Sequence, residues 1–213
     1  MKKILILFSI LFITTACTNI QKLEYKDIID NTINYNKNNK AFNHNGTGYK
    51  YYLPKYMSIK NSYNFNEKIN SNDNTYFLYV DIVSYYNNKK LENNKECQTN
   101  YDFKNDNIDG YLCINSVNDK YLVEIVYNYA KIEVKVDECY LKEAVNNSII
   151  ILSTIKYDRE LISNIIVENK IGNKEETLNI FGNKTKKQNF IEVIEEYDNY
   201  EPTDDIPDYD VIN

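Results

Sequence analysis

Apolar residues alternate with polar ones along much of the chain, with the period of two that is typical of β-strands. The clearest segment is 75–86, TYFLYVDIVSYY. One of its faces would carry only apolar side chains: Tyr76, Leu78, Val80 and Ile82. The other face includes a carboxylate: Phe77, Tyr79, Asp81, Val83 and Tyr85. We therefore predict a strand over 75–86, with one face in the core and the other half covered.

Further strands are predicted before and after this segment, over 49–54, 56–62, 110–116 and 120–136. The polar run 87–109 predicts a long loop that ends in the turn signal Asp109-Gly110.

Two turns are predicted among the later strands. Asn118-Asp119 separates two apolar runs and predicts the tip of a hairpin. Within 120–136 the apolar residues switch from odd to even positions. A strand cannot exchange its faces without an extra residue, so we predict a bulge or a tight turn near Asn128.

Helical spacing appears near both ends of the chain. Segment 21–35 predicts a short amphipathic helix, and 138–155 predicts the main helix, with Asp137 as its N-cap. The inward stripe of the main helix would be Leu141, Val145, Ser148, Ile149, Leu152 and Ile155. Later elements are predicted as a short helix, an edge strand and a last helix, over 161–166, 176–181 and 190–197. Strands in series followed by helices predict an α+β fold, an antiparallel sheet packed on one main helix with further short helices at the C-terminal end.

The first residues form a leader. Lys2 and Lys3 precede an unbroken apolar run, Ile4 to Ile13. Ten helical residues span about 15 Å, roughly half of the hydrocarbon core of a bilayer, which is typical of a secretory signal and too short to cross. The small residues Thr14, Thr15 and Ala16 follow, and then Cys17.

The stretch ITTAC resembles the lipobox of bacterial lipoproteins, although Thr14 stands where that family prefers Leu. The resemblance implies cleavage before Cys17 and acylation of its thiol, with palmitate-type chains holding the protein on the outer face of the cell membrane. The alternative is a plain signal peptide with Cys17 near the cut by chance. The predicted parts are a signal peptide at 1–16, the lipid anchor with a short helix and linker at 17–47, the α+β domain at 48–198, and an acidic disordered tail at 199–213.

Charge limits the classes of partner. Loss of Lys2 and Lys3 with the leader takes the formal net charge from −6 to −8. Nucleic-acid binding needs clustered Lys and Arg, so no nucleic-acid partner is predicted. The same balance argues against an electrostatic attachment to anionic lipid head groups.

Three cysteines remain besides Cys17. Cys97 and Cys113 bracket the segment CQTNYDFKNDNIDGYLC and are a candidate disulfide, with Cys139 left over. The alternative is that all three stay reduced, with Cys113 a small apolar strand residue. The spacings match no zinc site.

Residues for catalysis are scarce. His44 lies in the polar segment 36–48, which predicts a linker or loop, a poor place for a catalytic histidine. Asp81 is interpreted as a carboxylate bonded to a neighbouring Tyr, with a general acid as the alternative. Asn70, Asn72 and Asn74 favour a turn over a calcium loop, because Gly is missing where such a loop turns sharply. We therefore predict no catalytic residue, no metal site and no cofactor.

Tyrosines are the best functional lead, since Tyr suits protein or glycan contacts. Tyr51, Tyr79, Tyr85 and Tyr86 are the candidate binding surface, and the alternative is that these rings fill the core.

The order YYLPKYMSI, long strands, then a helix ending ILSTIKY resembles small extracytoplasmic domains of the PsbP/LpqN/Mog1 type over roughly 48–157, and also uncharacterised lipoproteins of AT-rich Gram-positive bacteria. The resemblance implies binding without chemistry. The predicted function is a membrane-anchored, non-enzymatic binding or adaptor lipoprotein, with membrane lipid and an envelope protein or wall glycan as partners. The alternatives are an envelope hydrolase that uses carboxylates such as Asp81 and a lipoprotein that captures a small solute.

Overall fold

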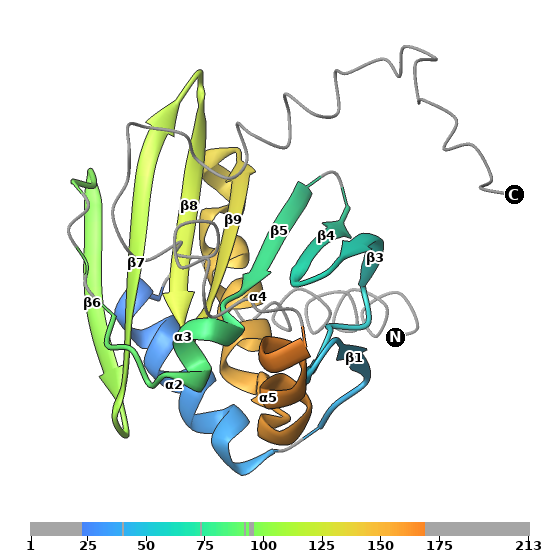
Figure 1. Ribbon diagram of the computed structural model, residues 1–213. Coiled ribbons are helices and arrows are strands. Elements are labelled where there is room, and N and C mark those ends of the chain that lie inside the picture. The colour runs from blue at the N-terminus through green and yellow to red at the C-terminus, as the bar shows by residue number, and fades with distance from the viewer. Residues whose placement is uncertain (1–22, 40, 73, 92, 94–95, 169–213) are drawn as a thin grey trace, which may run out of the picture.

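A large antiparallel sheet organises the fold (Figure 1). The computed structural model describes residues 23–39, 41–72, 74–91, 93 and 96–168. Among these residues, seven strands pair in the order β3-β4-β5-β9-β8-β7-β6. Their bounds are β3 Met57–Tyr63, β4 Asn66–Ser71, β5 Asn74–Val80, β6 Thr99–Asn105, β7 Ile108–Val117, β8 Lys120–Tyr127 and β9 Ala130–Val136. The predicted mixed α+β class with antiparallel strands is confirmed.

Two helices cover one face of this sheet. They are α2 (Tyr25–Asn38) and α4 (Leu141–Thr154), and α4 packs on β8 and β9. The two helices run in the same direction, since Thr32 Oγ1 donates to Asn146 Oδ1 over 3.1 Å and Asn36 Nδ2 donates to Ser153 Oγ over 2.8 Å. The sequence predicts one main helix, but α2 joins α4 in this layer through its buried isoleucines: Ile28, Ile29 and Ile33.

The predicted inward stripe of α4 is confirmed, because all six of its residues are buried: Leu141, Val145, Ser148, Ile149, Leu152 and Ile155. The predicted cap is wrong. Asp137 precedes a 3₁₀ turn (Glu138–Tyr140), and its side chain makes no capping hydrogen bond. The turn puts three residues between Asp137 and α4, so its carboxylate is too far along the chain to cap that helix.

A second, small sheet lies where both helices end. It has the order β1-β2-β10, formed by His44–Gly46, Tyr49–Tyr51 and Lys156–Tyr157, with both pairs antiparallel. The segment 36–48, predicted as a linker or loop, therefore contains strand β1. Helix α5 (Arg159–Glu168) follows β10 directly and includes the predicted helix at 161–166.

The two predicted turns are confirmed. Asn118 and Asp119 join β7 to β8, and Asn128 and Tyr129 join β8 to β9. All four residues have positive φ, between 49° and 61°, as a two-residue turn with the twist of its strands requires. The change of phase near Asn128 is therefore a complete reversal of the chain.

Two other predictions are wrong. The strand predicted over 75–86 ends at Val80, and helix α3 (Ile82–Tyr86) follows it. The predicted loop 87–109 contains β6, which pairs with β7, and the chain turns at Asp106, with φ 51°. β6 is an edge strand whose side chains are mostly exposed, so it lacks the apolar alternation that marks a strand in the sequence.

The leader, Cys17, the strand predicted at 176–181, the helix at 190–197 and the acidic tail lie outside the described residues. Within the described ranges, no helix is long and apolar enough to cross a membrane.

Cys97 and Cys113 form a disulfide. Cys113 lies in β7, and Cys97 lies two residues before β6. The bond therefore joins the start of an edge strand to its neighbour. Cys139 is exposed and does not take part in this bond.

We expect the double substitution Cys97→Ala/Cys113→Ala to lower the free energy of unfolding by about 3 kcal/mol, the usual value for a loop of this length. The two cysteines are 16 positions apart along the chain. Urea unfolding with and without a reductant measures the effect. The reductant should destabilise the unsubstituted chain and leave the variant unchanged. Equal stability of the two oxidised proteins would contradict the prediction.

Candidate functional site

A buried carboxylate connects the two sheets. Glu67, on β4 of the large sheet, has a side chain with no exposed surface. Its Oε1 accepts a hydrogen bond from the hydroxyl of Tyr49 over 2.7 Å, and its Oε2 accepts one from the hydroxyl of Tyr51. Both tyrosines belong to β2 of the small sheet. Burial, followed by the negative charge of Glu67, raises the pKa of both phenols well above the usual value, so both remain proton donors.

His44 contacts the same carboxylate from β1. Its Nε2 lies 3.3 Å from each oxygen of Glu67. Its side chain keeps 24% of its surface exposed, and its ring lies 4.9 Å from the ring of Tyr51. His44 is thus held by rigid structure, contrary to the linker placement expected from the sequence. Tyr49 contacts one oxygen of Glu67, Tyr51 contacts the other, and His44 lies near both. Glu67 therefore acts as a structural acceptor that holds the small sheet against β4.

Glycine is required where the ring of Tyr49 crosses β1. A Cβ on Gly46 would lie between 2.2 and 2.6 Å from two atoms of that ring and its hydroxyl oxygen. Gly48, in the turn between β1 and β2, has φ of 81°, a conformation that side chains rarely adopt. These two glycines let β1 and β2 turn tightly and bring Tyr49 to Glu67.

The other face of the small sheet is polar. The register places Lys50 of β2 opposite Asn45 of β1 and opposite Lys156 of β10. We call Asn45, Lys50 and Lys156 the lysine row. Residues alternate across a strand, so this row lies on the opposite side from Tyr49 and Tyr51. The hidden carboxylate network and the lysine row are therefore the two sides of one sheet.

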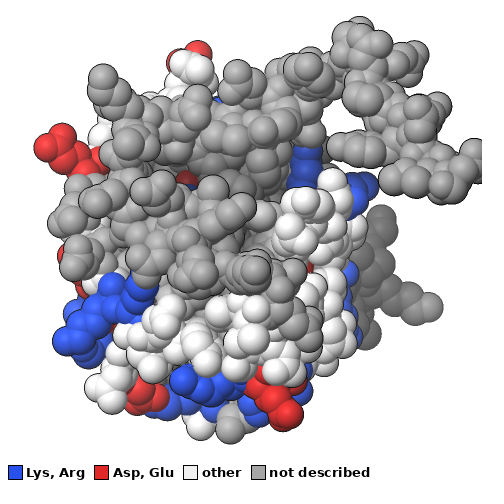
Figure 2. Space-filling view, viewed as in Figure 1, with Lys and Arg blue, Asp and Glu red and all other residues white. Residues whose placement is uncertain are grey.

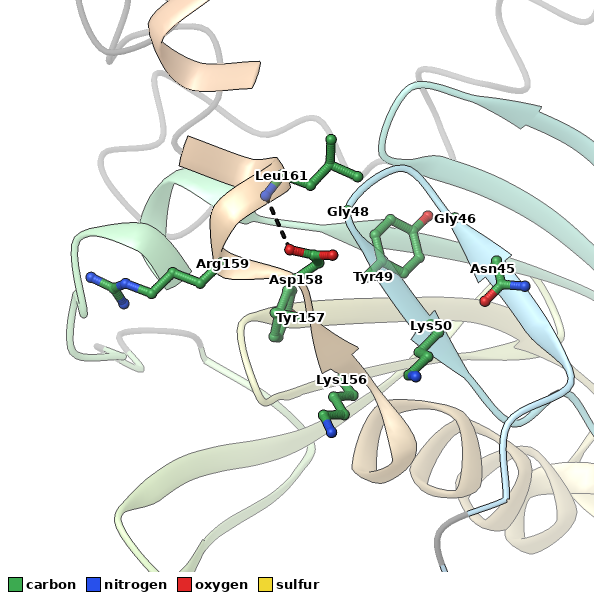
Figure 3. Close-up of a pocket in the computed structure, with 10 residues that line it drawn as sticks. All are labelled: Asn45, Gly46, Gly48, Tyr49, Lys50, Lys156, Tyr157, Asp158, Arg159 and Leu161. Carbon is green, nitrogen blue, oxygen red and sulfur yellow. Dashed lines mark hydrogen bonds between the residues drawn. The ribbon is translucent and has the colours of Figure 1, made fainter. Parts of the chain in front are cut away.

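The lysine row borders a hollow of about 510 Å³. Its remaining walls come from the turn after β1 and from the junction of β10 with α5: Gly46, Gly48, Tyr49, Tyr157, Asp158, Arg159 and Leu161 (Figure 3). In that view the side chains of Lys50 and Lys156 extend in the same direction, whereas Arg159 points away from them. Arg159 instead lies over the ring of Tyr86, 5.3 Å from its centroid.

Among the described residues, neither lysine of the row forms an ion pair. Lys50 Nζ lies 4.8 Å from the ring centroid of Phe42. The one carboxylate in the wall, Asp158, accepts a hydrogen bond from the backbone N–H of Leu161 over 3.0 Å and so caps α5. Like charges directly opposite each other on antiparallel strands are destabilising, so the lysine row favours an anionic ligand.

The surface around this region has mixed charge. Figure 2 shows basic and acidic side chains next to one another along the lower part of the face in view, where Figure 1 places α2 and α5. Along this lower edge, the described residues therefore do not form a continuous acidic surface.

The four candidate tyrosines do not form one surface. Tyr51 and Tyr79 are buried, with exposed fractions of 0% and 6%, and they belong to different sheets. Tyr85 and Tyr86 are half-buried on α3. The ring of Tyr85 stacks on Tyr157 with centroids 4.0 Å apart, which ties α3 to β10. The alternative, that tyrosines fill the core, describes Tyr51 and Tyr79.

Asp81 caps a helix. It is 1% exposed, and its Oδ1 accepts a hydrogen bond from the backbone N–H of Ser84, the third residue of α3, over 2.8 Å. Its Oδ2 is buried without a hydrogen-bond partner among the described residues. Burial is the largest cause that raises the pKa of Asp81, and the bonds from Ser84 oppose it. Among the described residues the carboxylate of Asp81 bonds to no tyrosine hydroxyl, contrary to the interpretation from the sequence. The backbone of Asp81 does contact tyrosines, since its N–H donates to the carbonyl of Tyr129 over 2.8 Å and its carbonyl accepts from the N–H of Tyr85 over 3.1 Å.

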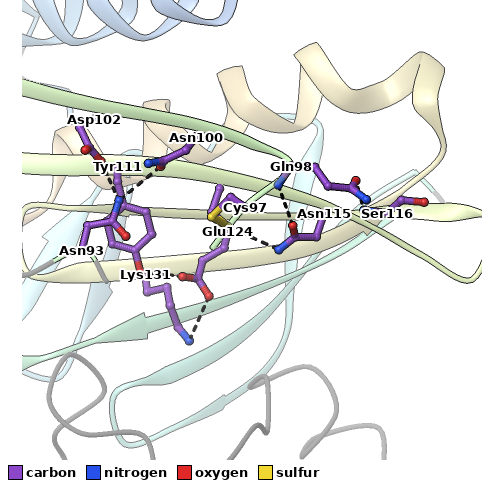
Figure 4. The surroundings of a disulfide bond; sticks show 11 residues. Asn93, Cys97, Gln98, Asn100, Asp102, Tyr111, Asn115, Ser116, Glu124 and Lys131 are labelled. Atoms are coloured by element: carbon purple, nitrogen blue, oxygen red, sulfur yellow. Dashed lines mark hydrogen bonds and ion pairs between the residues drawn. A yellow bond between two sulfur atoms is a disulfide. The ribbon is translucent and has the colours of Figure 1, made fainter. Parts of the chain in front are cut away.

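A second group of buried charges lies near the disulfide, on the face of the large sheet turned away from α4 (Figure 4). Lys131 Nζ lies 2.7 Å from Glu133 Oε1 and 3.9 Å from Glu124 Oε2. The hydroxyl of Tyr111 donates to Glu124 Oε1 over 2.6 Å. Burial raises the pKa of Glu133, and the positive charge of Lys131 opposes that rise. Lys131 lies between the two carboxylates, and its positive charge offsets the free-energy cost of burying their negative charges.

Another hollow, of about 560 Å³, lies at the start of the helix pair. Its wall is formed by Tyr25, Asp137, Glu138, Cys139, Leu141 and Lys142. This wall holds two acidic residues and Lys142, whereas the wall beside the lysine row holds Asp158 and three cations. Within the described ranges, no cluster of three His, Cys, Asp or Glu side chains is arranged to hold a metal ion.

Comparison with models of protein families and with curated proteins finds no match to this chain.

Glu67, Lys50 and Lys156 are not among the site residues predicted from the sequence. One signal was available, since Glu67 is in phase with Phe65 and Ile69, and a carboxylate on an apolar face needs donors. Lys50 and Lys156 lie 106 positions apart in the numbering and become neighbours only through the pairing of β2 with β10.

We expect Tyr51→Phe to lower the free energy of unfolding by about 1.5–3 kcal/mol, because a buried carboxylate loses a hydrogen bond. In a Glu67→Gln background the same change should cost at least about 1 kcal/mol less, since a neutral amide depends less on the donor. Urea unfolding of the four proteins measures this coupling.

The control is Tyr35→Phe on the exposed side of α2, where Tyr35 is 67% exposed. It should change stability by less than about 0.5 kcal/mol. Equal costs of Tyr51→Phe in both backgrounds would show that Glu67 does not depend on Tyr51.

Asp81→Asn should become progressively more favourable to stability as the pH rises from about 3.8, the usual pKa of the carboxyl. Because the folded chain raises this pKa, it holds the proton more tightly than the unfolded chain, and stability falls as Asp81 ionises. Asn keeps an acceptor for Ser84 and cannot ionise. Urea unfolding of both proteins at a series of pH values gives the difference.

The matched comparison is Asp81→Ala, which also removes the charge but loses the cap, at a cost of about 1 kcal/mol. A difference between Asp81→Asn and the unsubstituted chain that stays constant with pH would refute the assignment of a raised pKa.

Proposed function

We propose that the chain is an extracytoplasmic lipoprotein, held at the membrane by acyl chains on Cys17, whose domain binds a component of the cell envelope without chemistry. The observation that carries the binding role is the lysine row beside the 510 Å³ hollow. It is a polar surface whose two lysines form no ion pair with another described residue, and Glu67 fixes its sheet from behind. Binding sites are more precise when they lie on such rigid elements than on loops.

The sequence of the leader supports the anchor. Lys2 and Lys3, the apolar run and the small residues before Cys17 fit a signal that is removed, with a lipid in its place. Two or more acyl chains would hold the protein stably at the membrane surface.

The alternatives have less support. Glycoside hydrolysis needs two carboxyl groups facing a common cleft, about 5–9.5 Å apart. The hollow at the lysine row is lined by one carboxylate, Asp158, which caps α5. Capture of a small apolar solute needs an apolar pocket, whereas charged and polar side chains dominate this wall.

Replacement of Cys17 by Ala should move the protein from the membrane fraction to the soluble or secreted fraction, because the acceptor of the lipid is lost. Fractionation with mass spectrometry of the N-terminal peptide checks both the lipid and the cut before residue 17. An unsubstituted protein with an unmodified Cys17 would refute the anchor.

The binding role is tested in cells by a photo-crosslinking residue at position 156, with position 104 on β6 as the control. Both native side chains are exposed lysines. A distinct envelope component crosslinked only from position 156 is the expected result. The same products from both positions would contradict binding at the lysine row.

A further inference from the structure

The large sheet has a second face, turned away from α2 and α4, which we call the outer face. Phe77 of β5 and Leu122 of β8 belong to it, on either side of β9, and each is only 6% exposed. They form a cluster of their own, in which Val117 is the other apolar residue among those described. A sheet face open to water would leave apolar side chains of this size largely exposed. The pair of Phe77 and Leu122 therefore requires a cover.

The described loop before β6 covers a different part of the outer face. Leu91 and Cys97 from this loop pack on a separate cluster, which includes Val126, four positions after Leu122 along β8. The helix pair lies on the opposite face, where α4 packs on β8 and β9. The cover over Phe77 and Leu122 is therefore expected to come from residues outside the described ranges.

Lysines flank the apolar pair. The register places Lys68 of β4 opposite Phe77, and Lys68 Nζ lies 5.7 Å from the centroid of that ring. Lys135 of β9 is opposite Leu122. Both of these lysines are half-buried, whereas the carboxylates of the outer face are buried against Lys131, as described above. The part of this surface that a cover would meet is therefore apolar with a positive rim.

Two parts of the chain outside the described ranges are long enough to cover it, residues 1–22 and residues 169–213. Residues 1–22 contain no Asp or Glu, so they cannot complement the lysines. Residues 188–213 contain nine acidic residues and no Lys or Arg. The sequence also predicts a helix over 190–197, and acidic residues lie between the members of its apolar stripe: Phe190, Val193, Ile194 and Tyr197. This stretch has the apolar side and the acidic rim that the outer face requires.

The length of the chain allows this placement. The described residues end at Glu168, the last residue of α5, and α5 packs on α3, which follows β5. From α3 the whole of β5 extends about 23 Å, at about 3.3 Å for each of its seven residues. Residues 169–189 can span about 70 Å when extended, so they reach any part of the outer face.

We propose that residues 190–197 dock on the outer face, with their apolar side on Phe77 and Leu122 and their acidic residues beside Lys68 and Lys135. The outer face is then an interaction surface that the chain's own C-terminal segment occupies, and another partner could bind there only by displacing this segment. The inference goes beyond the proposed envelope-binding role and does not depend on a lipid at Cys17.

The first test is photo-crosslinking within the purified full chain, from a photoreactive residue at position 135. Trypsin releases residues 188–213 as one peptide, because it contains no Lys or Arg. Mass spectrometry should find this peptide joined to position 135 within one molecule. The control is position 35 on α2, where Tyr35 is 67% exposed, and it should give no such product. A product with residues 1–22, a crosslinked dimer or no product with 188–213 would each overturn the inference.

The second test removes the apolar side of the docking segment. Val193→Ser/Ile194→Ser in the full chain should raise the fluorescence of the dye ANS at least about threefold, because Phe77 and Leu122 become accessible. The matched control is Val211→Ser/Ile212→Ser, which makes the same two changes outside residues 190–197. Equal fluorescence of the two variants would contradict docking through residues 190–197.

The third test supplies the segment as a separate peptide. A synthetic peptide of residues 188–198 should bind the Val193→Ser/Ile194→Ser variant at least about tenfold more tightly than the unsubstituted chain, whose own segment competes at a high effective concentration. Equal affinity for both proteins would show that the intact segment does not occupy the peptide's site, which refutes the inference.

The same peptide tests the lysines. Added to that variant, Lys68→Gln/Lys135→Gln should weaken peptide binding about fivefold, since exposed ion pairs contribute modestly. The charge-matched control is Lys104→Gln/Lys120→Gln, whose lysines pair with Asp109 at 3.0 Å and with Asp137 at 3.9 Å. The control should leave the affinity unchanged. Equal weakening by both pairs would show that net charge alone attracts the peptide, and the outer face would lose its assignment.

Discussion

The hydrogen bonds from Tyr49 and Tyr51 to Glu67 are the constraint on which the geometry of the candidate site depends. The small sheet has three strands of only two or three residues each, too few backbone bonds to hold itself in place. A carboxylate on the neighbouring large sheet supplies the fixed point. Tyr52 N–H adds a bond to Thr154 Oγ1 at the end of α4, over 3.0 Å. The lysine row is thus rigid because of contacts on the far side of its own sheet.

Strong local patterns predicted much of the fold. The stripe of α4 and the Asn118-Asp119 and Asn128 turns depend on residues close together in sequence, and all are confirmed. The boundary at Val80 was missed because Ile82 and Val83 continue the apolar run, while the cap of Asp81 on Ser84 starts a helix. β6 was not predicted because most of its side chains are exposed, so its sequence lacks the alternation of apolar and polar residues that marks a strand.

Local sequence patterns predicted less of the candidate site than of the fold. Tyr51 and Tyr79 were predicted to belong to a binding surface, yet both are core residues. An alternating run of apolar residues does not show which of its two faces is covered. The lysine row combines residues from β1, β2 and β10, which only tertiary pairing brings together. His44 was placed in a linker for the same reason, since a three-residue strand carries too little periodicity to detect.

In the proposed lipoprotein, the disulfide between β7 and the start of β6 bears on export across the membrane. The cytosol keeps thiols reduced, so the bond between Cys97 and Cys113 would close only after translocation. Until then the start of β6 would be held by its pairing with β7 and by the hydrogen bonds of Gln98 with Asn115 and Ser116. The chain would therefore be easier to keep unfolded for passage across the membrane. Closure on the outer side, where an oxidant takes two electrons from the thiols, would then stabilise the folded state of the proposed lipoprotein and oppose its return to an unfolded, transportable chain.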